Sequence, residues 1–262
     1  MRSRWALPRE QAALQSLWKL CFGDDEEVTD CFFALFPPKL HTRVMDHDGR
    51  IAAMASWLPV TLHLDGRIIP GAYIYAVATH PDFRGKGLCR SLMEELEASL
   101  RLQGMEFAAL CPAEDSLYRF YGAMGYKTAF YRSCRMMKPG DNKTVLTQVS
   151  SAAYGTLRES CLSLSHCEWN QAALGYLAAT GVRFYRFSSG GCGAVQPGPE
   201  GRIRVLEVIS QDVSSAVAAL CFASGAQQAE VAQPGGEQPH GMLKWLKNGQ
   251  KVDSAYLGFA FD

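Results

Sequence analysis

Hydrophobic and polar residues follow two different periods along this chain, and the clearest example of each lies between residues 73 and 101. Residues 73–78 form a short, wholly apolar run rich in aromatic side chains, which is the pattern of a buried strand. Shortly afterwards leucines recur at every fourth position, so they share one face of a helix. These leucines are Leu88, Leu92, Leu96 and Leu100. The pattern predicts a strand, a short connection and a long amphipathic helix.

The rest of the first half is predicted to surround this unit. Apolar faces at helical spacing predict helices over residues 8–22 and 26–35, and Gly23 ends the first of them. Short apolar runs bounded by turn residues predict strands. These strands cover residues 42–46, 51–59, 61–64, 67–70, 107–111 and 129–136, with a further short helix at 116–121. The order is therefore helix, helix, antiparallel strands, and then strand–helix–strand–helix–strand.

The second half repeats that order in weaker form, after a predicted linker at residues 139–142. The predicted helices cover residues 149–163, 169–179, 213–222 and 241–247, and the predicted strands cover residues 182–187, 192–195, 203–209, 228–231 and 256–261. Where the first half has a basic turn after its central strand, the second half has Ser210, Gln211 and Asp212. Asp212 places negative charge there, so we expect no phosphate site in this half.

The connection before the leucine helix has the chemistry of an anion site. Arg84, Gly85, Lys86 and Gly87 lead directly into the helix, whose first N–H groups lack internal partners and whose dipole favours negative charge. The glycines let a phosphate approach the backbone, and the basic side chains add positive charge. A nucleotide P-loop is excluded, because it needs a glycine where His80 stands. We predict a pyrophosphate cradle.

Composition narrows the class of protein. The chain has 262 residues, 48% of them hydrophobic, and its 26 basic and 26 acidic residues balance, so it has no basic field for nucleic acid. Its nine cysteines include no CxxC pair, which favours reduced thiols in a cytoplasmic protein. No apolar run is long enough to span a bilayer. The nearest approach to a zinc ligand set is His166 with Cys167 and Cys161, and we expect no metal site.

Two motifs resemble those of the GNAT family of acetyl-CoA-dependent N-acetyltransferases. In the first, Arg84, Gly87 and Cys89 follow a strand at the spacing of the family's Arg/Gln-x-x-Gly-x-Gly/Ala pattern, with cysteine as a small-residue variant. In the second, residues 120–126 (Phe-Tyr-Gly-Ala-Met-Gly-Tyr) resemble the pattern Phe-Tyr-x-x-x-Gly-Phe. The resemblance covers roughly residues 1–137. It implies an acyltransferase with acetyl-CoA as the acyl-donor cosubstrate.

The repeated order of elements resembles, more specifically, the enhanced-intracellular-survival (Eis) group. In that group a catalytic GNAT lobe is followed by a degenerate one and then by a sterol-carrier-like domain. The resemblance implies a mixed α+β protein of tandem GNAT folds, each a mostly antiparallel sheet flanked by helices. We expect the catalytic domain at residues 1–138 and the degenerate domain at residues 139–262, without the sterol-carrier-like part.

The GNAT resemblance also implies which residues bind the cofactor. Val77, Ala78 and Thr79 would pair their backbone with the pantetheine arm, as an added strand does. The turn and the first helical turn would hold the pyrophosphate, mainly through backbone N–H groups. These residues are Arg84, Gly85, Lys86, Gly87, Leu88, Cys89 and Arg90. Ser116 either contacts the cofactor or only begins a helix.

Acetyl transfer to an amine must remove a proton from the amine and give one to the departing thiolate. A lysine-like amine has a pKa of about 10.4, so it is almost wholly protonated near pH 7 and some group must take its proton. The leaving thiolate, with a pKa of about 8.5, can take a proton from a phenol with a pKa of about 10 only if the site tunes both groups. Tyr121 fits the acid by type and position, with Tyr118 and Tyr126 as neighbouring alternatives. Residues 73–78 contain no carboxylate, so the base is either a water chain or the terminal carboxylate of Asp262, which in the Eis group reaches the active site. We expect direct attack without a covalent enzyme intermediate.

The sequence leaves the acceptor open among a small polyamine, an aminoglycoside-like compound and a lysine side chain. Phe32, Phe33, Trp57 and Tyr75 are candidates to line its cleft between the lobes, although the two phenylalanines fit a plain core as well.

Two other functions remain open. One is a non-catalytic acetyl-CoA-binding regulator, and the other is a two-lobe structural protein without a cofactor. A homo-oligomer is also left open.

Overall fold

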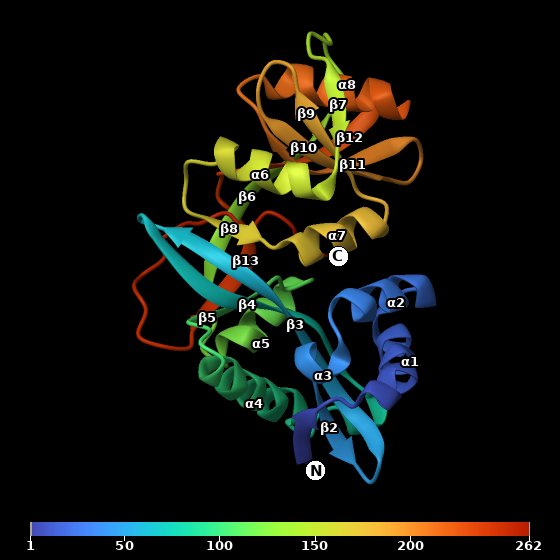
Figure 1. Ribbon diagram of the computed structural model, residues 1–262, viewed down its shortest axis with the longest axis vertical. Helices are drawn as coiled ribbons and strands as arrows, with labels where there is room; N and C mark the ends of the chain where they lie inside the picture. Colours follow the sequence, from blue (N-terminus) through green and yellow to red (C-terminus); the bar gives the residue numbers. More distant parts are fainter. Residues whose placement is uncertain (1, 262) are drawn as a thin grey trace.

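The computed structural model describes residues 2–261, and its strands form one long mixed sheet with helices against its faces (Figure 1). The strand order is β1-β2-β3-β4-β5-β13-β6-β12-β11-β10-β9-β7, and β8 pairs with β3 beside this path. All neighbouring strands are antiparallel except β4 with β5 and β11 with β12. The expected mixed, mostly antiparallel architecture is confirmed.

We call the part from β1 to β6 the first lobe; it occupies the lower half of Figure 1, from dark blue to green. Its elements are β1 (Arg2–Trp5), α1 (Gln11–Phe22), α2 (Glu26–Leu35), α3 (Pro38–His41), β2 (Thr42–His47), β3 (Arg50–Leu64), β4 (Arg67–Thr79), α4 (Leu88–Leu102), β5 (Phe107–Leu110), α5 (Asp115–Gly122) and β6 (Lys127–Met137). Short 3-10 helices lie at Pro8–Glu10 and Pro81–Phe83. The predicted runs 51–59 and 61–64 are one strand, β3, because Pro59 stays in register opposite Ala72.

The second lobe, from β7 to β12, lies above the first in Figure 1. Its elements are β7 (Leu146–Val149), α6 (Ser151–Cys161), β8 (His166–Trp169), α7 (Gln171–Ala179), β9 (Arg183–Phe187), β10 (Cys192–Pro197), β11 (Arg202–Ile209), α8 (Val213–Ser224) and β12 (Gln228–Pro234). The last strand, β13 (Gln238–Trp245), returns to the first lobe. Within residues 2–261, no helix is both long and apolar enough to cross a membrane.

Alternate residues of β3 face two different cores, because successive side chains of a strand point to opposite faces. Met54 and Leu58 belong to the cluster under α1 and α2, whereas Ala53 and Trp57 belong to the cluster under α4. The leucine stripe of α4 is buried in the second cluster, as its spacing predicts. The sheet of the first lobe is therefore covered on both faces.

The C-terminal part of the chain departs from the predicted elements in two places. Residues 241–247 were predicted as a helix, but β13 is a strand that pairs with β5 on one side and β6 on the other, and this double pairing overrides the local pattern. Residues 256–261 were predicted as a strand but form none; Ala255 and Tyr256 make isolated bridges to Phe130 and His166. β13 thus completes the sheet of the first lobe, while the predicted domain division at residue 138 stays a prediction.

Candidate active site

The sheet opens where β4 and β5 separate. The two strands are paired in parallel only from Gly71 to Tyr73. At the start of this pairing, the ring of Phe107 occupies the space that a side chain at Gly71 would need. Farther along, Ala76 has a φ of +51°, and the register of β4 against β3 shifts close by, which is the geometry of a β-bulge. A cavity of about 300 Å³ lies between the diverging strands, lined by residues of β4, β5 and α5.

The three residues predicted to pair with pantetheine lie at the far end of β4. Ala78 and Thr79 pair with Met54 and Ala53 of β3, and Val77 lines the cavity. The other edge of β4 has no strand beside it beyond Tyr73 among the described residues. Backbone groups on that edge are therefore placed to pair with an extended ligand.

The predicted pyrophosphate turn is open to solvent. Gly85 and Gly87 have φ values of +74° and +75°, which favour glycine, and Gly87 is the N-cap of α4. At neither position would a Cβ meet another atom within 4 Å. The exposed basic side chains are held by backbone oxygens, with Arg84 donating to Thr79 (3.1 Å) and Lys86 to Asp82 (2.9 Å). The turn is thus preformed and accessible to an anion.

The remaining predicted cofactor residues flank this turn. The side chain of Leu88 is buried under α4, and Arg90 donates to the carbonyl of Ala123 at 3.1 Å. Burial raises the pKa of the Cys89 thiol to about 11, so the thiol stays protonated near neutral pH. Ser116 lies exposed in the first turn of α5 and donates to Glu114. Its contact with a cofactor stays a prediction.

Tyr121 projects from α5 into the cavity between the strands. Its side chain is 8% exposed and packs edge-on against Tyr126, with ring centroids 5.9 Å apart. Burial, with a smaller contribution from Cys89, raises the pKa of the Tyr121 phenol well above its usual value. Tyr126 donates instead to Glu97 at 2.9 Å in a buried polar cluster with Lys244. Of the three candidate tyrosines, only Tyr121 is among the described residues that line the cavity.

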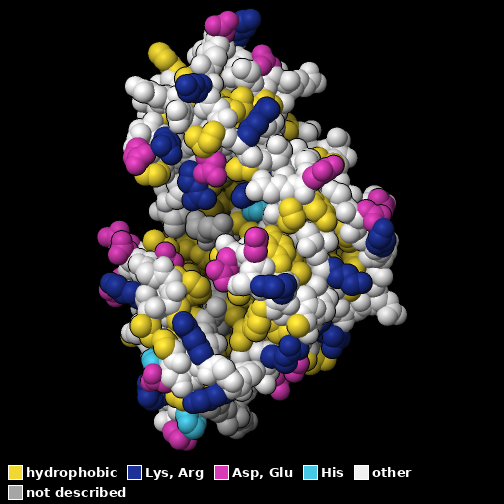
Figure 2. Space-filling view, turned by 180° about the vertical axis from the view of Figure 1, so that it is seen from behind, with side chains coloured by type: hydrophobic (Ala, Val, Ile, Leu, Met, Phe, Trp, Pro, Cys, Tyr) yellow, Lys and Arg dark blue, Asp and Glu magenta, His cyan; other side chains and the backbone are white. Residues whose placement is uncertain are grey.

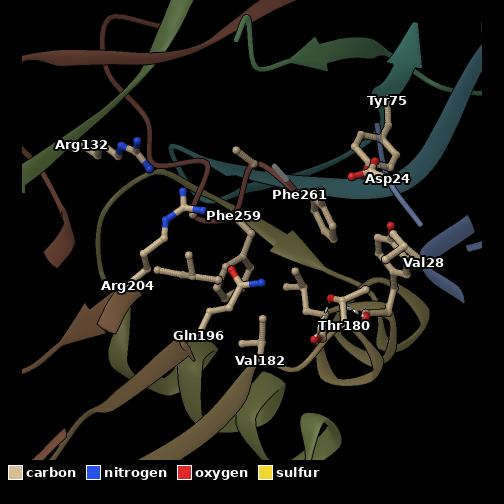
Figure 3. A pocket seen from close by; sticks show the side chains of 15 residues that line it. Asp24, Val28, Tyr75, Arg132, Thr180, Val182, Gln196, Arg204, Phe259 and Phe261 are labelled. Atoms are coloured by element: carbon tan, nitrogen blue, oxygen red, sulfur yellow. Dashed lines mark hydrogen bonds between the residues drawn. The ribbon is translucent and has the colours of Figure 1, made fainter. Parts of the chain in front are cut away.

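A second cavity of about 180 Å³ lies between the two lobes, next to the first (Figure 3). The two cavities share four lining residues, which are Asp24, Tyr75, Ala260 and Phe261. Asp24 is the only carboxylate among the described residues lining either cavity, and it accepts a hydrogen bond from Trp18 Nε1 at 2.7 Å. In Figure 3, Asp24 and Tyr75 lie at one end of this cavity and Arg132 and Arg204 at the other. A molecule in this cavity would therefore meet opposite charges at its two ends.

The end of the described chain is fixed at the junction of the cavities. Phe261 is 7% exposed and lies between Trp169 and Tyr75, with ring centroids 4.7 and 6.0 Å away. Tyr73 Oη donates to the carbonyl of Ala260 at 2.6 Å. Asp262, the predicted base, lies outside the described residues. In the space-filling view of Figure 2, the surface is hollowed between the two lobes and hydrophobic side chains line the hollow.

Several lining residues were not predicted. No spacing in the sequence connects Asp24 with Arg132 or Arg204, because they come from a loop, β6 and β11 of different lobes. Of the four aromatic residues proposed for the cleft, Tyr75 lines both cavities, whereas Phe32 and Phe33 are buried in one core and Trp57 in the other.

The part of the chain that contains this cleft matches a known protein family. Residues 8–129 match the profile described as acetyltransferase (GNAT) domain. The chain carries a GNAT acetyltransferase domain. The expected enzyme class is thus confirmed, and the open strand pair, the glycine turn and Tyr121 all lie within the matched residues.

Solved structures agree with this GNAT fold over nearly the whole chain. A probable N-acyltransferase from Enterococcus faecalis is 19% identical with a TM-score of 0.74, covering 94% of this chain and 73% of its own. A GCN5-related N-acetyltransferase from Anabaena variabilis is 16% identical with a TM-score of 0.77, and the match covers 94% of this chain and 73% of the Anabaena chain. Eis1 from Mycobacterium abscessus is 14% identical with a TM-score of 0.70, covering 94% and 74%, in keeping with the tandem arrangement. A comparison with curated proteins finds no match.

Proposed function

We propose that this GNAT protein transfers an acetyl group from acetyl-CoA to a primary amine by direct attack on the thioester. The observation that carries the proposal is that two neighbouring cavities share Asp24, Tyr75, Ala260 and Phe261 in their linings. One cavity lies along the open edge of β4 and contains Tyr121. The other reaches the same point from between the lobes, so donor and acceptor can approach each other from different sides.

The donor side fits an extended pantetheine and a pyrophosphate. The arm would pair with the free edge of β4 at Val77–Thr79, and the phosphates would bind the N–H groups at the start of α4. Arg84 and Lys86 add positive charge at that end. Support comes from the accessibility of the turn and from the cavity that begins where β4 leaves β5.

Tyr121 would supply the proton for the departing thiolate. Because its pKa is raised, the phenol is fully protonated near neutral pH and available as a donor. The surrounding side chains are mostly apolar, and low polarity also raises the basicity of a thiolate that forms there. The first effect keeps the proton on Tyr121 until the carbon–sulfur bond breaks, and the second favours its transfer to the thiolate that then forms.

A carboxylate is available to attract and orient the amine. Asp24 lines both cavities, so a protonated amine entering between the lobes is drawn to the point where they meet. The amine must then lose its proton, either to a water chain or to the terminal carboxylate of Asp262. The described chain reaches Phe261, which lines both cavities, and the second route is the one that the resemblance to the Eis group implies.

Removing Asp262 is therefore expected to lower kcat by about 10-fold or more and to change the acidic limb of the pH–rate profile, because a base is lost. The pH dependence of kcat/KM for the shortened protein and the full chain measures this. Asp253→Asn, on an exposed loop, is the control and should leave both unchanged. An unchanged rate and profile in the shortened protein would leave the water chain as the route.

The far end of the acceptor cavity favours an acidic group. Arg132 and Arg204 line it, and the buried Nε of Arg132 has no hydrogen-bond partner among residues 2–261. The neighbouring His240 does not add a charge, because burial and Arg132 lower its pKa to about 4. We infer an acceptor that carries a carboxylate or similar anion together with its amine, in preference to a polycation such as a polyamine.

A panel of paired acceptors tests both the acetyl transfer and the preference for an acidic acceptor. Each pair is an amino acid and the amine that lacks its carboxylate, assayed for acetyl-CoA-dependent N-acetyl product. We expect kcat/KM to favour the acidic member by about 10-fold or more, and Arg204→Ala to remove most of that preference. Higher activity on polyamines would refute the acidic acceptor but retain the enzyme. No product from any amine would refute the transferase.

A further inference from the structure

A cluster of histidine and glutamate side chains lies at the seam between the lobes, away from the acetyl-transfer cleft. His63 stands near the end of β3, directly opposite His166 on β8 in the ladder that joins the two lobes. Glu159 reaches the same point from α6. One ligand atom from each of these three side chains lies within 4.8 Å of the other two. Glu168 Oε2 lies beside them, 2.7 Å from His63 Nε2.

Hydrogen bonding around His166 calls for a positive charge at this point. Its Nδ1 lies 2.7 Å from the carbonyl oxygen of Leu164, which can only accept, so Nδ1 carries a proton. In a neutral ring Nε2 then presents a lone pair, yet it faces Glu159 Oε2 at 2.7 Å. Two acceptors cannot bind each other. Either a second proton sits on His166 or a cation lies between the two groups.

The ring of His63 lies face to face with that of His166, with centroids 4.9 Å apart and planes 1° from parallel. The Nε2 atoms of both rings lie near Glu159 Oε2, at 2.7 Å for His166 and 3.9 Å for His63. A single metal ion can bind one nitrogen of each ring and the carboxylate at once.

Two of the three ligands are also oriented by groups behind them. Leu164 fixes the tautomer of His166, and Arg158 Nη1 donates to Glu159 Oε1 at 3.0 Å, which leaves Oε2 to face the imidazoles. Such supporting contacts are typical of metal ligands.

We propose that His63, Glu159 and His166 bind a divalent transition-metal cation, most suitably Zn²⁺, with Glu168 or water at the fourth position. Two imidazole nitrogens and a carboxylate form a recognised zinc donor set, with metal–ligand distances of about 2.0–2.2 Å. Ligand atoms around a tetrahedral zinc ion are then about 3.3 Å apart. Glu159 Oε2 lies 2.7 Å from one histidine nitrogen and 3.9 Å from the other, so small side-chain shifts reach that geometry.

Bound metal would fasten the second lobe to the first at this seam. His63 belongs to the first lobe and the other ligands to the second, so the ion would cross-link the two lobes beside the β3–β8 ladder. β8 continues to Trp169, which donates to the carbonyl of Leu257 at 2.9 Å and packs against Phe261. The ion would therefore stabilise the position of Phe261, which lines both cavities.

This site replaces the zinc ligands considered from sequence. Successive residues of β8 alternate in direction, so His166 and Glu168 face the cluster while Cys167 between them is fully buried on the other side. Burial also raises the pKa of the Cys167 thiol, which opposes metal binding as thiolate. His63, the missing ligand, is about a hundred residues away and no local spacing reveals it.

Metal binding is tested on tag-free full-length protein after chelation and dialysis, titrated with Zn²⁺ alone. We expect one ion per chain by calorimetry and a rise in Tm of about 5–10 °C when zinc reaches about 100 times its Kd. Co²⁺ in place of zinc should give an absorption spectrum of tetrahedral nitrogen and oxygen ligands without thiolate charge transfer. His63→Ala and Glu159→Gln should abolish the tight site, whereas His47→Ala, at the end of β2 in the first lobe, should keep it.

Three results would overturn the proposal. They are no saturable one-to-one binding, equal binding by wild type, His63→Ala and Glu159→Gln, or a cobalt spectrum with thiolate bands that points to cysteine ligands. Glu159→Gln retains the size of the side chain, so it reports on the ligand even if a histidine variant fails to fold. The measurement needs no substrate, so it stands or falls independently of the proposed acetyl transfer.

Discussion

Tyr121→Phe is expected to lower kcat by about 10²- to 10⁴-fold, the usual contribution of a general acid, while acetyl-CoA affinity changes less than about twofold. The hydroxyl is the only group removed, and it lies in the cavity between β4 and β5 rather than at the pyrophosphate turn. The buried ring stays in place against Tyr126. Thiol release measures kcat, and calorimetry measures the Kd of acetyl-CoA.

Tyr126→Phe is the matched control for this variant. It also removes a buried tyrosine hydroxyl, but one that donates to Glu97 and does not line the cavity. We expect it to reduce stability by about 1–3 kcal/mol, because Glu97 loses a buried donor, and to leave kcat within a few fold. Equal losses of kcat in the two variants would show that Tyr121 acts through packing and not as an acid.

Glu207→Gln is expected to destabilise the fold by about 3–5 kcal/mol, the largest stability effect we predict. Arg158 and Glu207 form an ion pair at 2.9 Å with side chains 1% and 0% exposed. Burial works against the charge of Arg158, and Glu207 outweighs burial and raises the pKa of that guanidinium. Without the carboxylate, Arg158 keeps its charge in a dry interior. Chemical denaturation measures the change in free energy of unfolding.

Two further variants test whether the loss of stability in Glu207→Gln comes from the unpaired charge of Arg158. Glu200→Gln removes a carboxylate that pairs with Arg202 at the same distance of 2.9 Å but on the surface, and it should change stability by less than about 1 kcal/mol. Arg158→Met combined with Glu207→Leu removes both charges and should cost less than the sum of the single changes. If Glu207→Gln costs no more than Glu200→Gln, the pair does not hold the second lobe together.

The central strand, turn and helix could be predicted from sequence because their signals are local. The four leucines of α4 lie within one helix, and Gly85 and Gly87 adopt the positive φ values that a tight phosphate-binding turn requires. Tyr121 follows from a motif a few residues long. In each case the residues that define the feature are close in the chain.

The features that were missed depend on contacts across the chain. β13 was predicted as a helix because nothing in residues 241–247 shows that β5 and β6 stand apart by one strand. Asp24 and Arg204 line one cavity only because the lobes face each other, and His63 meets His166 only through the β3–β8 ladder. Pairing between distant strands decides all three, and it leaves no periodic signal.

The most direct test of the central claim compares acetyl-CoA consumed with N-acetylated amine formed in the same reaction. The account predicts that wild type forms one acetylated amine for each CoA thiol released, that Tyr121→Phe forms both far more slowly, and that acetyl-CoA raises the Tm of both proteins. Tight binding of acetyl-CoA with no acetylated amine would contradict the account and identify a cofactor-binding regulator. No change in Tm at any acetyl-CoA concentration would exclude the cofactor itself.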